Sequence, residues 1–280
     1  MARFSPVSRE RHVGKRWRRP VNFAAAAGDA VVPVVGGELA RLALAMPVAF
    51  IEQSGRYQLV AALSLTPGHN MFVGPDGRWL GGYIPAFCRS YPFRLLPSQG
   101  TGESVLSVDE ESALIAEAES GGEAFFDADG EVSQAVRPIL DLLVENERSR
   151  KGTEVAVSAL AEVGVIRRWP ILLKAGEDER TVTGLHRIDE AALNALGDEA
   201  FLKLRRAGAL PLAYAQLLSM GRLDVFDELA RLHAESARTA AASRPAALDS
   251  RLRLPPHEVV RFDQIGQSVV GPPETETWIE

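Results

Sequence analysis

The first half of the chain contains short apolar runs separated by turn-forming residues, which is a pattern typical of antiparallel strands. Residues 48–52 and 57–65 flank Ser54 and Gly55 and predict a β-hairpin. A short helix is expected before them at residues 38–45, and a further strand at residues 104–108. Because the connections are too short to hold a crossover helix, these strands predict an antiparallel meander.

In the second half, apolar positions recur three and four residues apart, which is the spacing of one helix face. Helices are predicted at residues 133–148, 153–163, 189–196, 198–207, 212–218 and 223–234. A second hairpin is predicted within residues 169–187. The chain therefore predicts an α+β fold, in which an antiparallel meander sheet from the N-terminal half packs with helices mainly from the C-terminal half.

Charge and periodicity divide the chain into three parts. Residues 1–20 are rich in arginine and lysine and predict a basic, partly mobile arm. The apolar stretch that follows is interrupted by Asn22, Gly28, Asp29 and Pro33, so we do not expect a signal peptide. Residues 21–235 carry the periodic patterns and predict a single α+β domain. From residue 236 to 280 the periodicity is lost and alanine, arginine and proline dominate, which predicts a flexible tail.

Residues 69–97 differ from the rest of the chain, and we call them the aromatic–arginine segment. They read HNMFVGPDGRWLGGYIPAFCRSYPFRLLP. Pro75, Asp76 and Gly77 have the chemistry of a tight turn and predict a hairpin. The aromatic side chains each bury on the order of 150 to 250 Å² in a folded protein. We therefore expect this segment to lie at the centre of the core.

The arginines of this segment allow two interpretations. In the functional one, guanidinium groups beside aromatic rings bind a small anionic or sugar-like ligand through bidentate hydrogen bonds and stacking. In the structural one, each arginine reaches water or pairs with an acidic neighbour while its stem covers apolar surface. The candidate ligand-binding residues under the first interpretation are His69, Asn70, Arg78, Trp79, Tyr83, Arg89, Tyr91 and Arg94.

Composition excludes several classes of protein. The net charge of -6 argues against nucleic acid as a partner, since nucleic-acid-binding proteins usually present a strongly basic face. No run of about 18 apolar residues occurs, so no transmembrane segment is expected. Cys88 is the single cysteine, which excludes an internal disulfide and is compatible with the cytoplasm, where we expect the protein. Without an identified histidine partner, Cys88 is expected to be a buried, inert thiol.

No motif predicts a cofactor, a metal ion or a catalytic residue. His69 lacks partners at metal-ligand spacing. Residues 125–131 resemble part of a calcium-binding loop but lack its ligand spacing and distal glutamate, so an ordinary turn is expected there.

Several separated motifs, in the right order, resemble the bacterial SapC-like protein family. Its signature reads approximately HNLFV, a DG-W, then YIPA and RYPF. This chain has HNMFV at 69–73, DGRW at 76–79, YIPA at 83–86 and YPF at 91–93. The resemblance extends over about residues 12–233, and one departure is the stretch CRS at 88–90, where the family more often has a basic pair.

The resemblance implies a cellular context for the protein but no particular reaction. The family is distinct from a peptide-transporter permease of the same name, which the missing membrane spans exclude. Its members are often encoded beside TonB-dependent receptors, flavin-dependent tryptophan-halogenase-like proteins and cupin-like hydroxylases. This implies an accessory role in nutrient uptake or modification, and it supplies no catalytic residues.

Three hypotheses follow. The first is a non-enzymatic accessory or ligand-binding protein centred on the aromatic–arginine segment, with a small ligand or a protein as partner. The second is an enzyme of unknown reaction, which requires His69, Asn70 or His186 to meet a carboxylate within hydrogen-bond reach. The third is a surface-layer or envelope structural protein, which cell fractionation would test.

Overall fold

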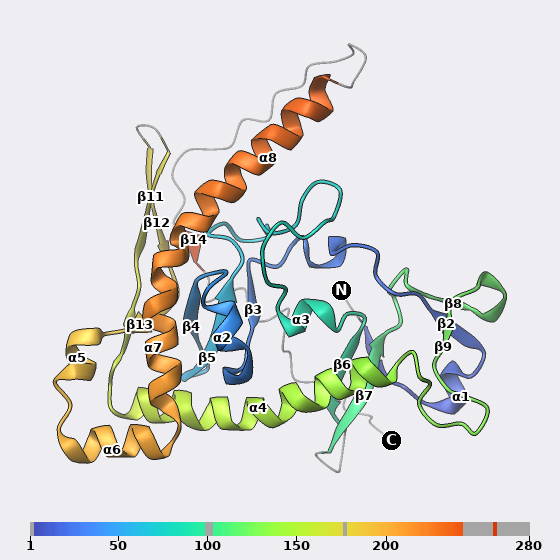
Figure 1. Ribbon diagram of the computed structural model, residues 1–280, viewed down its shortest axis with the longest axis horizontal. Coiled ribbons are helices and arrows are strands. Elements are labelled where there is room, and N and C mark those ends of the chain that lie inside the picture. The colour runs from blue at the N-terminus through green and yellow to red at the C-terminus, as the bar shows by residue number, and fades with distance from the viewer. Residues whose placement is uncertain (1–2, 99–102, 176–177, 243–259, 262–280) are drawn as a thin grey trace, which may run out of the picture.

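The computed structural model describes residues 3–98, 103–175, 178–242 and 260–261 (Figure 1). Its sheets are mainly antiparallel and its longer helices lie in the C-terminal half, which confirms the α+β class. The strands are β1 (Phe4–Pro6), β2 (Lys15–Trp17), β3 (Val31–Pro33), β4 (Val48–Gln53), β5 (Arg56–Ala62), β6 (Phe93–Pro97), β7 (Ser104–Asp109), β8 (Ile115–Glu117), β9 (Glu123–Ala124), β10 (Ile166–Arg168), β11 (Ile171–Ala175), β12 (Asp178–Thr183), β13 (Leu185–Ile188) and β14 (Val260–Arg261). The α-helices are α1 (Arg9–His12), α2 (Leu39–Leu42), α3 (Ala86–Arg89), α4 (Arg137–Glu162), α5 (Glu190–Asn194), α6 (Asp198–Arg206), α7 (Ala209–Ser219) and α8 (Val225–Ala242). Short 3-10 helices are η1 (Ala24–Ala26), η2 (Gly36–Glu38), η3 (Ala118–Ser120) and η4 (Met220–Asp224).

The largest sheet has the strand order β10-β13-β4-β5-β3. The hairpin β4–β5 confirms the predicted one, and its turn residues Ser54 and Gly55 have positive φ angles of 49° and 75°. Such angles suit a two-residue hairpin turn, because the turn then follows the twist of the strands. Strand β13 pairs with β4, so residues from the second half of the chain complete a sheet that begins in the first half.

Two hydrophobic cores lie side by side along α4. The large core lies between the five-stranded sheet and the helices α4 and α7, and it includes Phe50, Leu160 and Leu212. The small core includes Trp17 and Phe93 and lies under the sheet β1-β7-β6. Helix α4 runs along the lower side of both (Figure 1). It therefore joins the two halves of the molecule into one body.

Helix α4 is continuous, whereas the sequence predicted two helices with a break near Gly152. A Cβ at Gly152 would meet no heavy atom, so this glycine has no special backbone role. Next to it, Thr153 Oγ1 donates a hydrogen bond to the carbonyl of Ser149 and accepts one from the amide of Gly36. These bonds fasten η2 to the middle of α4, and tertiary packing therefore offsets the small cost of a glycine in a helix.

Residues 3–20 belong to the folded body, which corrects the expectation of a separate basic arm. Strand β1 pairs with β7, and β2 pairs with β8 and β9. Trp17 and His12 are completely buried in or against the small core. His12 and Trp17 point inward although arginines surround them in the sequence. Burial of these two rings holds the stretch in place.

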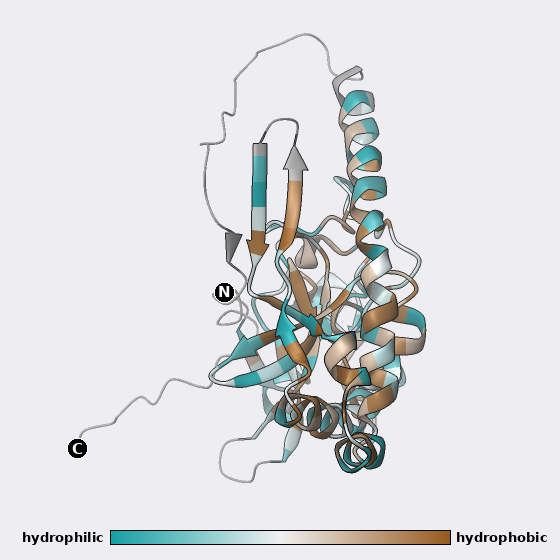
Figure 2. Ribbon diagram, turned by 90° about the vertical axis from the view of Figure 1, so that its left-hand side faces the viewer, coloured by the Kyte–Doolittle hydropathy of each residue, from teal (hydrophilic) through white to brown (hydrophobic). Residues whose placement is uncertain are grey.

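The C-terminal boundary also differs from the predicted one. Helix α8 continues to Ala242, beyond the expected domain end at residue 235, and it projects from the body in both views (Figures 1 and 2). The hairpin β11–β12 projects on the same side. Of the expected tail, residues 243–259 and 262–280 lie outside the described residues, and β14 pairs in parallel with β12. No described helix is long and apolar enough to span a bilayer.

Candidate functional site

The aromatic–arginine segment was expected at the centre of the core, and the structure shows that it contributes to both cores. Phe72 is completely buried in the large core and Phe93 in the small core. Trp79 stacks on Phe72 with ring centroids 5.4 Å apart. Helix α3, which belongs to the same segment, lies in the middle of the molecule between β3 and β6 (Figure 1). The segment is therefore part of the core, and its expected hairpin is reduced to one bridge between Val73 and Trp79.

Three of the predicted site residues lie away from the centre of the segment. His69 is exposed, and its ring lies 5.8 Å from that of His233. Asn70 is buried and structural, because its amide donates to the carbonyl of Ala26 and its side-chain oxygen accepts from the amide of Phe72. Arg78 is exposed at the turn, where it forms an ion pair with Asp76 at 2.5 Å. Within the described residues, the contacts given for these three side chains share no partner.

A buried carboxylate, Glu38, holds the middle of the segment. Its Oε1 accepts a hydrogen bond from the hydroxyl of Tyr83 at 2.9 Å and one from the amide of Ala86 at 2.7 Å. The indole nitrogen of Trp79 donates to the carbonyl of Tyr83 at 2.8 Å. Burial is the main reason that the pKa of Tyr83 is raised, and the charge on Glu38 adds to it. These contacts fix the start of α3.

Arg89 completes this arrangement, which we call the Glu38 clamp and define as Glu38, Tyr83, Ala86 and Arg89. The Nε of Arg89 donates to the carbonyl of Ile84 at 2.9 Å, and its Nη2 lies 3.8 Å from Glu38 Oε1. Nη2 also donates to the Tyr83 hydroxyl at 3.3 Å. The charge of Arg89 is therefore compensated within the fold, which supports the structural interpretation for this arginine.

Arg94 has different surroundings. It lies on β6 and its guanidinium carbon stands 3.9 Å from the centre of the Phe87 ring and 5.7 Å from that of Phe4. Its Nη1 donates to Ser90 Oγ and to the carbonyl of Phe93, both at 2.9 Å. Among the described residues, no carboxylate forms an ion pair with Arg94, and its Nε and Nη2 donate to no acceptor. The half-buried guanidinium is thus held in place through Nη1, while its Nε and Nη2 have no hydrogen-bond acceptor among the described residues.

The groups around Arg94 have shifted acidities, and we call Asp29, Phe87, Cys88, Tyr91 and Arg94 the Arg94 cluster. Burial lowers the pKa of Arg94 to about 10, so the guanidinium stays charged at neutral pH. Burial raises the pKa of Asp29 to about 6, and the charge of Arg94 offsets part of that rise. Asp29 therefore interacts with Arg94 electrostatically without a direct ion pair.

Two other members of the cluster are inactive as acids at neutral pH. Burial raises the pKa of Cys88 to about 12, and the nearby Asp29 adds to the rise. The side chain is buried, which confirms the expected buried thiol. Burial also raises the pKa of Tyr91, whose hydroxyl donates to Asp109 Oδ2 at 3.0 Å. The cluster is consequently a cation with neutral walls, and the carboxylates of Asp29 and Asp109 both act on its charge without forming an ion pair with it among the described residues.

The free edge of Arg94 has a specific chemistry. Nε and Nη2 lie on the same edge of the guanidinium plane, and together they present two parallel N–H donors. This fork matches the two oxygens of a carboxylate or phosphate. The stacked Phe87 ring limits the motion of the guanidinium and excludes water from one face. The arrangement is therefore suited to binding a small anion.

Sequence reasoning missed the two acidic residues that distinguish the arginines. Glu38 was placed at the start of a short helix, and Asp29 only appeared as an interruption of an apolar stretch. Each acts on an arginine that is distant in the sequence, Glu38 by direct contact and Asp29 through its charge, so no local spacing reveals it. Their isolation as single acids among apolar neighbours is the only signal in the sequence.

The residues of the enzyme hypothesis do not come together. His186 Nε2 lies 3.9 Å from Glu52 Oε2, beyond hydrogen-bond reach. The pKa of His186 is lowered, chiefly by burial. His69 and Asn70 make their contacts elsewhere, as described above. In the described part of the chain, no three histidine, cysteine or carboxylate side chains are grouped to hold a metal ion.

The chain matches one protein-family model, that of SapC, over residues 7–225. Neither the curated proteins nor the solved structures contain a match. The matched range includes the small core, all of the large core except Phe226 and Leu229, the Glu38 clamp and the Arg94 cluster. The resemblance noted in the sequence is thus confirmed, and the chain belongs to the SapC family.

Proposed function

We propose that this protein is a non-enzymatic accessory protein that binds a small anionic ligand at Arg94. The observation that supports this most directly is the Nε and Nη2 edge of a half-buried guanidinium that is charged at neutral pH and, among the described residues, has no acceptor on that edge. A buried charge is costly unless it is paired, so a fold that leaves one unpaired favours an incoming partner of opposite charge. A carboxylate or phosphate supplies that partner.

The ligand class follows from the surroundings. Phe87 offers an aromatic face, while Asp29 places an acidic group nearby. An anion gains from Arg94 and is repelled by an ionised Asp29, so binding and protonation of Asp29 favour each other. Affinity should therefore increase as the pH falls through about 6.

The binding test is calorimetric titration of the full chain with acetate, succinate, citrate, inorganic phosphate and, as a neutral sugar, glucose. We expect at least one anion to bind and glucose not to bind. Arg94→Gln should weaken binding about tenfold or more, which corresponds to about 1.4 kcal/mol. Arg78→Gln is the matched control, since it removes an exposed arginine of the same segment that is already paired.

Equal affinities in the Arg94→Gln and Arg78→Gln chains would contradict the proposal. Thermal unfolding of each variant in the absence of ligand shows whether it is folded. Arg94→Lys adds a further distinction, because lysine keeps the charge but lacks the two-donor fork. Weak binding by Arg94→Lys would indicate that the fork, and not only the charge, recognises the anion.

We propose nutrient uptake beside TonB-dependent receptors as the cellular setting of this binding. The support for this setting is membership of the SapC family together with the gene neighbours that the family resemblance implies. Affinity purification from the native cell, with mass spectrometry of bound proteins and small molecules, tests it. Recovery of a receptor or its cargo is the expected result. Recovery of surface-layer material instead would favour the envelope hypothesis.

A further inference from the structure

Helix α7 has an exposed face without charged side chains. Its residues, ALPLAYAQLLS, include no charged side chain. One face is buried against α4 and the five-stranded sheet. The opposite face exposes Pro211, Tyr214 and Leu218, and the side chain of Leu218 is 79% exposed. These residues are three and four positions apart, so they form one stripe along the helix.

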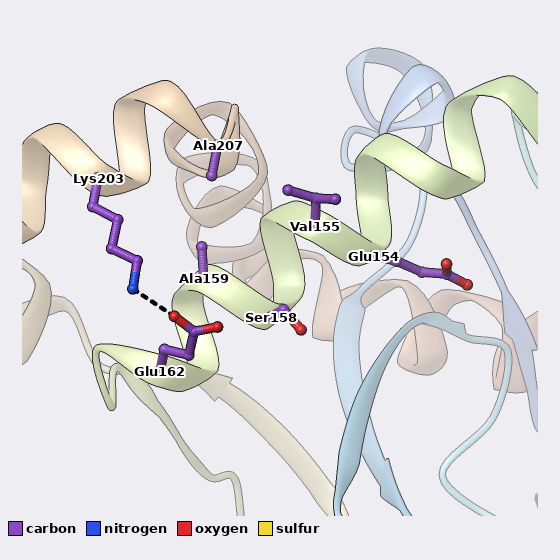
Figure 3. Close-up of a pocket in the computed structure, with 7 residues that line it drawn as sticks. All are labelled: Glu154, Val155, Ser158, Ala159, Glu162, Lys203 and Ala207. Atoms are coloured by element: carbon purple, nitrogen blue, oxygen red, sulfur yellow. Dashed lines mark hydrogen bonds and ion pairs between the residues drawn. The ribbon is translucent and has the colours of Figure 1, made fainter.

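Exposed apolar residues also lie on the elements that pack against α7. Helix α2 packs against α7 and is followed by Leu44, which is 77% exposed. Helix α4 packs against α7 and exposes Val155. Figure 3 shows Val155 beside Ala159 and Ala207, which line a groove between α4 and α6 near the start of α7. The α7 face, defined as Leu44, Val155, Pro211, Tyr214 and Leu218, is thus larger than a single exposed leucine and indicates an interaction surface.

Charges of opposite sign lie at the two ends of this face. Helix α6, at the start of α7, exposes Arg205 and Arg206. The first turn of α8, beyond the end of α7, exposes Asp227 and Glu228. Within the described residues none of these four forms an ion pair. Figure 2 shows the change from the apolar α7 to the more hydrophilic α8 along one side of the molecule.

The charge pattern fits a second copy of this chain. In a twofold dimer the same patch meets itself, so each charged end must meet an end of opposite sign. An antiparallel pair of α7 helices satisfies this condition, because it places Arg205 and Arg206 opposite Asp227 and Glu228 of the other copy. The sequence midpoint of these two charged pairs falls between Tyr214 and Leu218, at the centre of the apolar stripe. The dipoles of two antiparallel helices also attract each other, which favours the same arrangement.

We propose that the α7 face is a homodimer interface in which α7 of one copy packs antiparallel to α7 of the other. The helix alone is short, and stable interfaces bury about 800 Å² on each partner. Leu44 and Val155 enlarge the contact, and the dimer is expected to be weak and concentration-dependent. The dimer brings no ligand-binding residue of one copy into the other, so it is independent of anion binding at Arg94.

The test is sedimentation velocity of the full chain from nanomolar to high micromolar concentration. The unmodified chain should pass from monomer to dimer. Leu218→Glu places a charge at the centre of the interface and should raise the dimer dissociation constant about tenfold or more. Leu172→Glu is the matched control, because Leu172 is an exposed leucine on the distant strand β11, and it should leave the dimer unchanged.

A charge-reversal series tests the antiparallel arrangement itself. Arg205→Glu with Arg206→Glu should weaken the dimer, and so should Asp227→Arg with Glu228→Arg. All four substitutions together should restore it, since opposite charges again meet. A chain that stays monomeric at every concentration would overturn the proposal. A dimer that is insensitive to Leu218→Glu, or that the fourfold variant does not restore, would overturn it as well.

Discussion

Arg89 and Arg94 lie five residues apart in the same segment, yet the fold treats them differently. Arg89 meets the buried carboxylate of Glu38 and two further oxygen acceptors. Arg94 packs on Phe87 and donates hydrogen bonds from Nη1, whereas its Nε and Nη2 have no acceptor in the part of the chain that the structure describes. This difference is why we propose Arg94, and not Arg89, as the ligand-binding residue.

Removal of the clamp carboxylate should have the largest effect on stability. Glu38→Ala leaves the Tyr83 hydroxyl and the Ala86 amide without their acceptor, and it removes the counter-charge of Arg89. We expect the free energy of unfolding to fall by about 3 to 4 kcal/mol, measured by urea denaturation. Glu38→Gln keeps an acceptor oxygen and should lose less. Two variants of equal stability would show that the charge of Glu38 is all that matters.

Asp29 should cause a pH dependence of stability on the Arg94 side. Its pKa in the folded protein is about 6, above the ordinary value of 3.8, so the folded state holds the proton more tightly. Its stabilising contribution is therefore present below about pH 4 and is lost as the pH rises through about 6. At pH 7, Asp29→Asn should raise the free energy of unfolding by about 2 kcal/mol. A pH profile identical to that of the unmodified chain would contradict the assignment.

His12 should give the opposite pH dependence from the small core. Burial lowers its pKa below the ordinary 6.5, so the folded state disfavours the protonated ring. The unfolded chain then binds more protons, and stability should fall as the pH decreases below about 6.5. His12→Gln should reduce this loss in urea unfolding measured between pH 7 and 5. In an Asp29→Asn background the opposing effect of Asp29 is removed, and the loss that remains comes from His12 and His186. If His12→Gln did not reduce the loss in that background, the prediction would be refuted.

Arg78 should have the smallest effect. It is 77% exposed and its ion pair with Asp76 is local to the turn. Arg78→Gln should change the free energy of unfolding by less than about 0.5 kcal/mol, since exposed ion pairs contribute little. Thermal unfolding and anion titration should both match the unmodified chain. A marked loss of anion affinity would place the turn, rather than β6, at the binding site. A marked loss of stability would contradict the small contribution expected of this ion pair.

Elements that depend on local interactions could be predicted from the amino-acid sequence. Ser54 and Gly55 set the β4–β5 turn, and Asp189 caps α5 by accepting the amide hydrogen of Ala192. Apolar periodicity located the later helices, and the aromatic content of residues 69–97 correctly predicted that they lie in the core. These features depend on residues within a few positions of one another, where backbone preferences and side-chain spacing act directly.

Which polar groups meet depends on the tertiary structure. It joined two predicted helices into α4 through bonds to η2, and it drew residues 4–17 into the small core by burying Trp17. It paired Arg89 with Glu38 and left Arg94 beside Asp29 without an ion pair. Such contacts depend on how two cores are placed against each other, and that placement minimises exposed apolar area over the whole chain. For this reason the segment was evident from the sequence, whereas the residue proposed to bind a ligand was evident only from the fold.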